Sequence, residues 1–462
     1  MHESTTGKQN TAASAEGLDR AIGTFGATAI VVGTVIGSGI FLVPHDVAQR
    51  VGTVGAVFAV WIVGAVLSLA GALSLAELGA AMPQAGGIYI YLREAYGKLF
   101  AFLYGWALLL VINSGSLATL AVAFGIYSAT FVPLSPVGQK VVAGGVIAVL
   151  TFINYIGVRK ASAIQVIFTA AKLGGLVTLM GFAFFHPRAN LASASAVPHS
   201  GGAFSLSSAG VALIGVLWAY EGWHMLSFNI GEVRDPARSV ARSYFLGMVL
   251  VVAAYLGANL AYLRVLPLNL IAQDQYQRVA ARVMEILAGP RGASFVSALI
   301  LCSVFGALNG TTLGGPRAYF AMARDGVFFT SVGRVHSKFK TPALAILIQG
   351  LWAIVLAATG SYRQLYTYVI FTGWIFYGAS ALGVIVLRRR RPDLPRPYLV
   401  WGYPLLPVAF ACGALAVVTN ALVRTPTEAL IGAALVAAGI PIYLFWRRAA
   451  EPGGRPVVEA KK

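Results

Sequence analysis

The chain has 462 residues, of which 58% are hydrophobic and only 11% charged, and its formal net charge is +18. Because an ordinary soluble domain carries about 25% charged residues, this composition excludes a soluble globular protein and predicts an integral membrane protein. The basic residues fall mainly at the ends of apolar stretches, where membrane topology and anionic headgroups explain them, so the charge does not indicate a nucleic-acid partner.

Apolar stretches long enough to cross about 30 Å of hydrocarbon recur along nearly the whole chain. Helices are expected, because a membrane β-barrel would show short alternating strands instead. The predicted fold class is therefore an all-α integral membrane protein with twelve transmembrane helices, at approximately residues 25–43, 54–82, 99–131, 140–157, 161–186, 207–230, 241–266, 293–321, 342–360, 363–387, 402–422 and 426–446.

The predicted domain organisation is a single membrane domain, residues 21–448, between flexible polar tails at 1–20 and 449–462. The first tail lacks the apolar core of a cleavable signal peptide. Most of the 34 lysines and arginines fall on the same side of the membrane as the N-terminus. Both termini are therefore expected in the cytoplasm.

Few segments between the predicted spans are long. The longest loops are expected on the outer side, near residues 187–206 and 267–290. The basic cytoplasmic stretch at 322–341 has room for a short surface helix.

Two predicted spans are interrupted in mid-membrane. The first carries a Gly-Ser-Gly run (37–39) within GTVIGSGIFLVP, and the sixth carries Glu221 within LWAYEGW. Interrupted helices at corresponding positions of two halves are typical of inverted-repeat transporters. We therefore expect repeats at about 25–186 and 207–387, followed by two further helices.

The interruptions have a chemical use. A helix that unwinds within the membrane leaves backbone N–H and C=O groups in need of partners. N–H groups at the start of a half-helix suit a carboxylate, and carbonyls at the end of one suit an ammonium, so an amino acid fits both. The alternative is that Gly33, Gly37 and Ser38 only allow close helix packing; the second interrupted span favours a binding site.

Five sequence blocks stand out in chain order: GTVIGSGIFLVP (33–44), SLAELGAAMPQAGGIYIYLREAYG (74–97), LWAYEGW (217–223) with NIGEVRDPAR (229–238), FGALNGTTLGGPRAYFAMARDG (305–326) and RRRRPDLPRPY (388–398). Over roughly residues 20–445 they resemble the amino acid–polyamine–organocation (APC) transporter superfamily, and most closely bacterial relatives of its L-type amino acid transporter branch. The resemblance implies a leucine-transporter-like fold, with a five-plus-five inverted repeat, two C-terminal helices, and helices 1 and 6 unwound at mid-membrane.

The same resemblance implies a substrate site at the two interruptions. Amides of the first would face the substrate carboxylate, and carbonyls of the second would hold its amino group. Trp218 stands where the family has an aromatic that closes the site from outside; a core- or lipid-facing aromatic is the alternative. The implied substrate-binding residues are Ile36, Gly37, Ser38, Gly39, Trp218, Ala219, Glu221, Gly222 and Tyr255.

Glu221 is an acid near the centre of the bilayer. A carboxylate at this depth costs about 2.5 to 3.5 kcal/mol on insertion scales, so it should face a cavity or a partner. It is expected beside the substrate cavity, attracting an ammonium or taking part in proton coupling. The alternative is that it caps the broken helix or orders neighbouring side chains.

Lys172 is a second charged residue deep in a span. It lies about 16 Å beyond Ala161 along a helix, too far in to reach the interface easily. Within FTAAKLGG (168–175) it matches the lysine that replaces a bound sodium ion in related sodium-independent transporters. The resemblance therefore implies a sodium-site surrogate in contact with the first broken span.

Other polar residues in the spans have more than one reading. Interhelical hydrogen bonding is expected for Asn113, Ser114 and Ser116. Ion pairs of an inner gate, or merely exposed helix-end charges, are expected for Glu77, Arg93, Glu94 and Arg324. The two cysteines, Cys302 and Cys412, fall within apolar spans and are expected to be packing residues.

The sequence and the resemblance together predict a secondary active transporter, sodium-independent, that exchanges neutral L-amino acids by alternating access. The alternative is a proton-coupled transporter of cationic amino acids, amines or polyamines. A membrane-embedded enzyme is disfavoured, because neither HExxH nor GxSxG occurs.

We expect no cofactor, no metal and no nucleic-acid partner, and a location in the plasma membrane, as a bacterial inner-membrane protein. No covalent accessory subunit is expected, because the extracellular cysteine by which animal relatives bond to a glycoprotein is missing.

Overall fold

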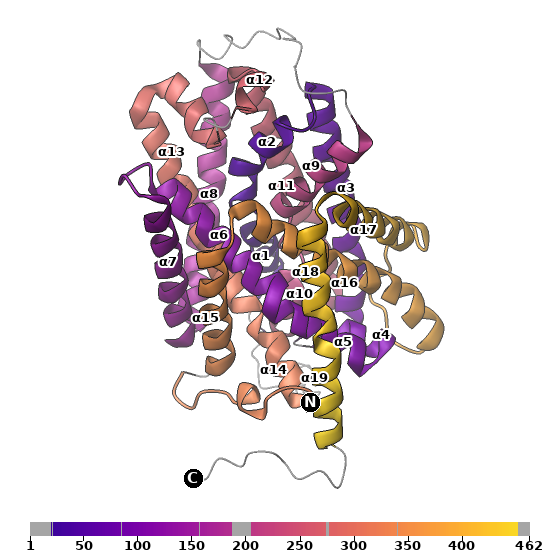
Figure 1. Ribbon diagram of the computed structural model, residues 1–462. Coiled ribbons are helices and arrows are strands. Elements are labelled where there is room, and N and C mark those ends of the chain that lie inside the picture. Colours follow the sequence, from indigo (N-terminus) through magenta and orange to yellow (C-terminus); the bar gives the residue numbers. More distant parts are fainter. Residues whose placement is uncertain are drawn as a thin grey trace, which may run out of the picture.

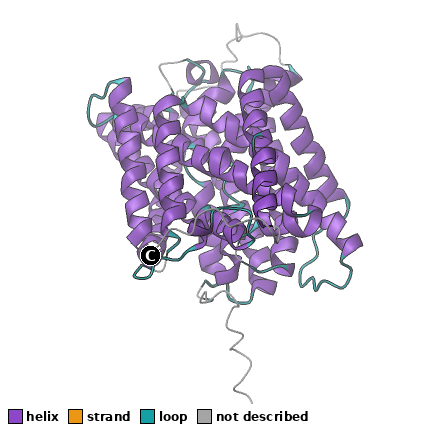
Figure 2. Ribbon diagram, turned by 60° about the horizontal axis from the view of Figure 1, so that its bottom comes forward, coloured by secondary structure: helices purple, strands orange, loops and turns teal. Residues whose placement is uncertain are grey.

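The computed structural model describes residue 20 and residues 22–84, 86–156, 158–186, 205–273, 277–339 and 341–450. Most of the polar tails (residues 1–19 and 451–462) and most of the outer loop expected near 187–206 (residues 187–204) lie outside these ranges. The described residues form helices joined by short connections (Figure 2), and their β-structure is limited to one isolated bridge between Ile22 and Val233. The expectation of an all-helical membrane protein is confirmed for this part of the chain.

The elements follow one another with few long connections (Figure 1). In chain order they are α1 Thr24–Val35, α2 Gly39–Ala48, α3 Val54–Ala81, α4 Ile88–Tyr96, α5 Lys98–Ala107, the π-helical turn η1 Leu108–Ile112, α6 Asn113–Ser128, α7 Pro136–Ile156, α8 Val158–Phe185, α9 Leu206–Ala219, α10 Met225–Asn229, the 3-10 turn η3 Ile230–Glu232, α11 Pro236–Val265, α12 Leu268–Ile271, α13 Val279–Gly314, α14 Pro316–Arg324, the 3-10 turn η5 Thr330–Gly333, α15 Ala343–Thr359, α16 Tyr362–Arg390, α17 Leu405–Arg424, α18 Pro426–Ala437 and α19 Gly439–Ala450.

Nine helical segments of the described chain are long and apolar enough to cross a membrane. A tenth crossing is available if α1 and α2, which meet at 42°, are counted as one broken span. Two shorter apolar helices, α9 and α15, add to these. The multi-pass membrane architecture is therefore clear from length and composition.

One expected loop is wrong in part. The outer loop expected near 267–290 contains the first part of α13, which starts at Val279 and is separated from the rest of α13 by a kink at Gly289 (φ 70°). Residues 279–288 are thus helical rather than part of an outer loop. Arg282 and Glu285 break the apolar pattern there but form an ion pair along the helix, with Nη1 and Oε2 2.8 Å apart.

Two smaller features also differ from expectation. The third span contains a π-helical turn, η1, which the apolar sequence gives no means of locating. The basic stretch at 322–341, expected to hold a surface helix, instead carries the end of α14 and the single turn η5.

The broken helix α1–α2 lies near the middle of the bundle. Figure 1 shows α12 at one end of the molecule and α14 with the end of α19 at the opposite end. Helix α1 packs against α8, α11 and α13, and α2 packs against α9. Because α1 is apolar on all sides and buried along its second half, the unwound segment is surrounded by protein.

The two interrupted helices are tied together on the side where α1 begins. The N–H of Ile22 donates to the carbonyl of Glu232 at 2.9 Å, and the N–H of Arg234 donates to the carbonyl of Ile22 at 2.7 Å. The chain entering α1 is therefore paired with the chain leaving η3. Both breaks are held in register by this short parallel pairing.

Candidate functional site

The first break lies between α1 and α2. Helix α1 ends at Val35, and Ile36 has extended dihedrals (φ −73°, ψ 90°) before α2 starts at Gly39. Among the described residues, no backbone carbonyl accepts from the amides of Gly37, Ser38 and Gly39. These N–H groups stand at the start of a half-helix, where partial positive charge favours an anion.

The second break lies between α9, which ends at Ala219, and α10, which begins at Met225. Gly222 has φ +119°, and a Cβ on it would lie 2.7 Å from the carbonyl oxygen of Thr34. The hydroxyl of Thr34 donates in turn to the carbonyl of Gly222 at 3.0 Å. Only glycine allows this close contact between the two breaks.

The breaks also meet at Gly39. A Cβ on Gly39 would overlap the Cα of Ala219, so the start of α2 lies directly against the end of α9. The hydroxyl of Tyr255, from α11, is within hydrogen-bond distance of the carbonyls of Val35 (3.0 Å) and Ala219 (2.9 Å). Both residues therefore join the two breaks, Ala219 through its backbone contact with Gly39 and Tyr255 through its hydroxyl. Neither residue lines the cavity described next.

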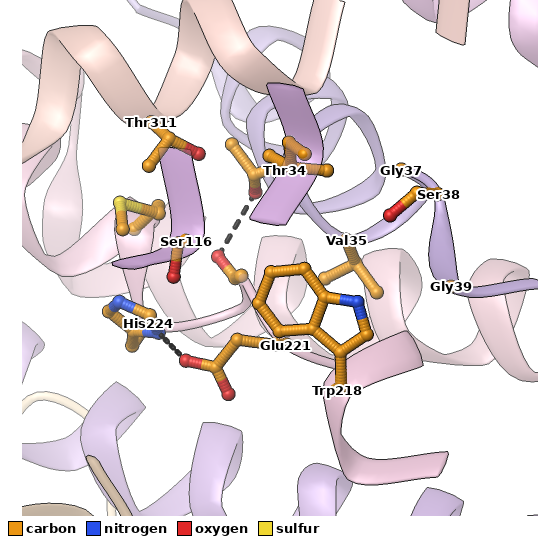
Figure 3. A pocket seen from close by; sticks show the side chains of 13 residues that line it. Thr34, Val35, Gly37, Ser38, Gly39, Ser116, Trp218, Glu221, His224 and Thr311 are labelled. Atoms are coloured by element: carbon orange, nitrogen blue, oxygen red, sulfur yellow. Dashed lines mark hydrogen bonds and ion pairs between the residues drawn. The ribbon is translucent and has the colours of Figure 1, made fainter. Parts of the chain in front are cut away.

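A small cavity opens between the breaks (Figure 3). Its free volume is about 20 Å³, which is room for about one water molecule. Six of the nine predicted substrate-binding residues line it: Gly37, Ser38, Gly39, Trp218, Glu221 and Gly222. The residues that sequence reasoning did not assign to the site are Thr34, Val35, Ser116, Leu120, His224, Met225 and Thr311.

Lys172 reaches the first break from α8. Its ammonium donates to the carbonyls of Gly33 at 2.8 Å and Ile36 at 2.6 Å, and the residue is 1% exposed. The hydroxyl of Ser303 also donates to Ile36, at 3.2 Å. Ile36 thus faces Lys172 through its carbonyl and does not line the cavity.

Glu221 lies at the polar side of the cavity. One carboxylate oxygen, Oε1, accepts from the hydroxyl of Tyr377 at 2.7 Å and lies 3.2 Å from Nδ1 of His224. The other oxygen, Oε2, is buried and has no hydrogen-bond partner among the described residues. His224, which was missed because a lone histidine in a span carries no pattern, points at Glu221 in Figure 3.

Trp218 closes one side of the cavity together with the start of α16. Its indole N–H donates to the hydroxyl of Tyr362 at 2.9 Å, and that hydroxyl lies 3.0 Å from the hydroxyl of Ser38. Tyr366 stacks on Trp218 with ring centroids 6.3 Å apart and donates to Asp46 at 2.8 Å. Tyr362 therefore connects α2, α9 and α16 through one hydroxyl.

The charged residues expected at an inner gate do not form one shared set of ion pairs. One set surrounds Glu77 and another surrounds Arg93. Glu77, 1% exposed, accepts two hydrogen bonds from Arg388, at 2.8 and 2.7 Å. Arg93 pairs with Glu94 at 3.1 Å and with Asp325 at 2.7 Å. Arg324 lies over the ring of Phe320 instead, 5.9 Å from its centroid.

Of the three polar residues expected to form interhelical hydrogen bonds, one does so in the described chain. Ser114 has a buried hydroxyl without a partner among the described residues, and Ser116 donates along its own helix to the carbonyl of Ile112 at 2.6 Å. Asn113 donates to the side chain of Gln349 at 2.7 Å and to the carbonyl of Thr311 at 3.2 Å, which is interhelical hydrogen bonding. Cys302 is partly buried, whereas Cys412 is exposed on α17 and does not pack in the core. The part of the chain that the structure describes holds no cluster of side chains able to bind a metal ion.

The chain is similar to known proteins over most of its length. A model of the family described as amino acid permease matches residues 22–445. The serine/threonine exchanger SteT of Bacillus subtilis (strain 168) is 32% identical over 431 residues, which cover 92% of this chain and 97% of the relative. Two mouse proteins are also 32% identical: large neutral amino acids transporter small subunit 2, over 93% of this chain and 82% of the relative, and b(0,+)-type amino acid transporter 1, over 93% and 88%.

Proposed function

We propose a transport function from the premise that the chain belongs to the amino acid permease family. The chain is accordingly a multi-pass membrane transporter and not an enzyme. Its proposed activity is sodium-independent exchange of neutral L-amino acids by alternating access. The printed names of the relatives, one an exchanger and two transporters of amino acids, support this proposal.

The cavity between the two breaks carries the proposal. Amides of Gly37, Ser38 and Gly39 suit the substrate carboxylate, because their N–H groups have no backbone acceptor in the described chain. The end of α9 and the free oxygen of Glu221 suit the α-ammonium. A zwitterion therefore finds complementary charge at both ends of one small space.

Lys172 supports sodium independence. A sodium ion at a helix break would need carbonyl and hydroxyl oxygens as ligands. Here the carbonyls of Gly33 and Ile36 are already engaged by a fixed ammonium. Transport then needs no bound sodium to satisfy these oxygens, since the positive charge is part of the protein.

Alternating access requires that the cavity open to each side in turn. The Trp218–Tyr362–Ser38 contacts close it on the side where α16 begins. The free space of about 20 Å³ is too small for an amino acid. Loading therefore requires these contacts to separate, which makes them the outer gate.

The span count and topology belong to the same proposal. Nine long helices, the broken pair α1–α2 and the shorter helices α9 and α15 would give the proposed twelve crossings if each of the two shorter helices also spans the membrane. The breaks at α1–α2 and α9–α10 would be equivalent positions of a five-plus-five repeat. Both termini are proposed to lie in the cytoplasm of a bacterial cell, on the side of the membrane rich in lysine and arginine.

A proton-coupled transporter of cationic amino acids, amines or polyamines is the second candidate. The observation that favours it is Glu221 Oε2, a buried carboxylate oxygen without a partner in the described chain. A proton or a substrate ammonium would satisfy it. The same carboxylate is compatible with neutral substrates if the α-ammonium of the substrate takes this place.

We also propose that the chain forms no disulfide with an accessory subunit. The sequence contains two cysteines, and both lie within long apolar helices, α13 and α17, rather than in outer loops. The name small subunit, carried by one mouse relative, weighs against independence for that protein. A larger complex in native membranes on non-reducing gels, lost on reduction, would contradict the proposal.

The test is counterflow into proteoliposomes preloaded with a panel of amino acids and amines. Labelled neutral L-amino acids should enter vesicles preloaded with unlabelled neutral L-amino acids, and cationic amino acids and polyamines should not. Preferential uptake of cationic substrates into empty vesicles with an inward proton gradient would replace the main proposal by the second. No movement of any amino acid would overturn both.

A further inference from the structure

Four buried tyrosines have hydroxyls that the site does not use. Tyr91 on α4, Tyr104 on α5, Tyr244 on α11 and Tyr319 on α14 are each at most 1% exposed. None of their hydroxyls has a hydrogen-bond partner among the described residues. We call these four residues the tyrosine cluster.

The four tyrosines lie near one another and near Glu221. Tyr104 is close enough to Tyr91, Tyr319 and Glu221 to interact with them electrostatically. Tyr244 is similarly close to Tyr91 and Tyr104. The cluster, whose members lie on four different helices, therefore occupies one region beside Glu221.

Helix α5 packs against both α4 and α14. A Cβ on Gly105, next to Tyr104, would overlap the sulfur of Met322 on α14. Tyr244 lies near the backbone amide of Ser227, and Tyr319 near the side chain of Asn113, but neither pair has hydrogen-bond geometry.

An ion pair, which we call the Arg93–Asp325 latch, joins the segments that carry Tyr91 and Tyr319. Nη1 of Arg93 on α4 donates to both carboxylate oxygens of Asp325, which directly follows α14, at 2.9 and 2.7 Å. The hydroxyl of Tyr89 donates to Asp325 at 2.7 Å. Arg93 follows Tyr91 by two residues and Asp325 follows Tyr319 by six, so the latch joins the segments that carry these two tyrosines.

A buried hydroxyl without a partner destabilises the state in which it is buried. Four of them in one place call for a second state in which water or a ligand satisfies them. We propose that the tyrosine cluster lines the cytoplasmic half of the substrate path, and that its hydroxyls solvate the charged amino acid after the Arg93–Asp325 latch opens. This inference rests on the proposed transport function and assigns the residues that carry substrate from the cavity to the cytoplasm.

The test compares Tyr→Phe variants with the wild-type exchanger in proteoliposomes. Tyr91→Phe and Tyr104→Phe each remove only an unpartnered oxygen, so both proteins should melt at a higher temperature than the wild type. Loss of one hydrogen bond to a passing charged group should lower the maximal exchange rate about tenfold. The external half-saturation concentration should stay unchanged, because the cavity itself is intact.

Tyr127→Phe is the matched control. Tyr127 is equally buried, but its hydroxyl donates to the carbonyl of Phe41 at 3.2 Å. This variant should melt at a lower temperature than the wild type and keep its exchange rate. Wild-type exchange rates in Tyr91→Phe and Tyr104→Phe, or lower melting temperatures, would overturn the assignment while leaving the transport function intact.

Accessibility gives a second readout that does not depend on turnover. In a Cys302→Ser, Cys412→Ser background, Tyr319→Cys should react with a water-soluble thiol reagent from the cytoplasmic side. Adding Asp325→Asn should increase the labelling rate, since the latch is weakened. An unchanged labelling rate of Tyr319→Cys after Asp325→Asn would contradict the coupling between the latch and the tyrosine cluster. If the wild type exchanges no amino acid at all, the transport proposal fails rather than this one.

Discussion

The ammonium nitrogen of Lys172 lies 2.6 Å from the carbonyl oxygen of Ile36, the residue at which α1 ceases to be helical. The break frees carbonyls that would otherwise accept helical hydrogen bonds, and Lys172 donates to two of them. Because its stem is anchored in α8, a charge that a mobile ion could supply is covalently fixed. The sodium independence proposed for this transporter follows from this contact.

Lys172→Met should slow exchange strongly. Methionine keeps most of the stem but leaves the carbonyls of Gly33 and Ile36 without their donor. Hydrogen bonds from charged groups contribute about 1.5 to 3 kcal/mol each, so the exchange rate should fall by at least about tenfold. Lys140→Met is the control, because exposed Lys140 also donates to one carbonyl, of Ala358 at 2.7 Å. Equal rates in Lys172→Met and the wild type would contradict the role.

Gly39→Ala should destabilise the protein. The added Cβ would overlap the backbone of Ala219, which has no flexible end to move aside. Overpacking of this kind costs about 1 to 3 kcal/mol, seen as a lower melting temperature in detergent. Gly145→Ala on α7, where no atom lies within 4 Å of the new Cβ, should be neutral or stabilising. Similar melting temperatures for both variants would contradict the close contact of α2 and α9.

Tyr362→Phe should weaken the outer gate. The change removes the hydroxyl that contacts both Trp218 and Ser38, while the aromatic packing stays. Exchange should slow about fivefold, as expected for loss of about 1 kcal/mol in the closed state. In a double-mutant cycle, Ser38→Ala should add little to Tyr362→Phe, because both disrupt one contact. Full additivity of the two effects would show that Ser38 and Tyr362 act separately.

Glu221→Gln should alter transport without unfolding the protein. Glutamine can still accept from Tyr377, but the negative charge beside His224 and the substrate is lost. Exchange should fall about tenfold, the scale of one charge-assisted interaction. Glu285→Gln, which removes an exposed ion-pair partner on α13, is the control. Unchanged rate, substrate range and pH dependence in Glu221→Gln would exclude both substrate and proton roles.

Tyr89 should hold the inner latch through the physiological pH range. Burial, and then the hydrogen bond to Asp325, raise the pKa of Tyr89 above its ordinary value of 10.0. A raised folded-state pKa means that its contribution to stability is fully present below pH 10.0 and lost only as the pH rises above that value. Wild type and Tyr89→Phe should therefore differ in melting temperature by a constant amount between pH 6 and pH 9. A difference that shrinks within that range would contradict the assignment.

Several features of the fold follow directly from the sequence. Apolar stretches located the membrane helices, because length and hydropathy are sufficient for segments such as α3, α11 and α16. The Gly-Ser-Gly run located the first break, because it places three poor helix formers next to one another within a span. The helical start of α13 was missed, since its charges hide it from an apolar pattern.

The site was harder to predict, because its contacts join residues far apart in sequence. Lys172 could be singled out as a charge deep in a span, but its two carbonyl acceptors are set by the packing of α8 on α1. His224, Tyr362 and Asp325 have no distinguishing pattern of their own. They gain meaning only through Glu221, Ser38 and Arg93, which the fold brings to them.

The most direct test of the central claim is uptake of a labelled neutral L-amino acid by the wild-type protein in sodium-free proteoliposomes, with or without unlabelled amino acid inside. The account predicts uptake that requires internal amino acid and is unchanged when sodium is added. Uptake into empty vesicles that appears only with an inward sodium gradient would contradict it, because Lys172 would then not replace the ion.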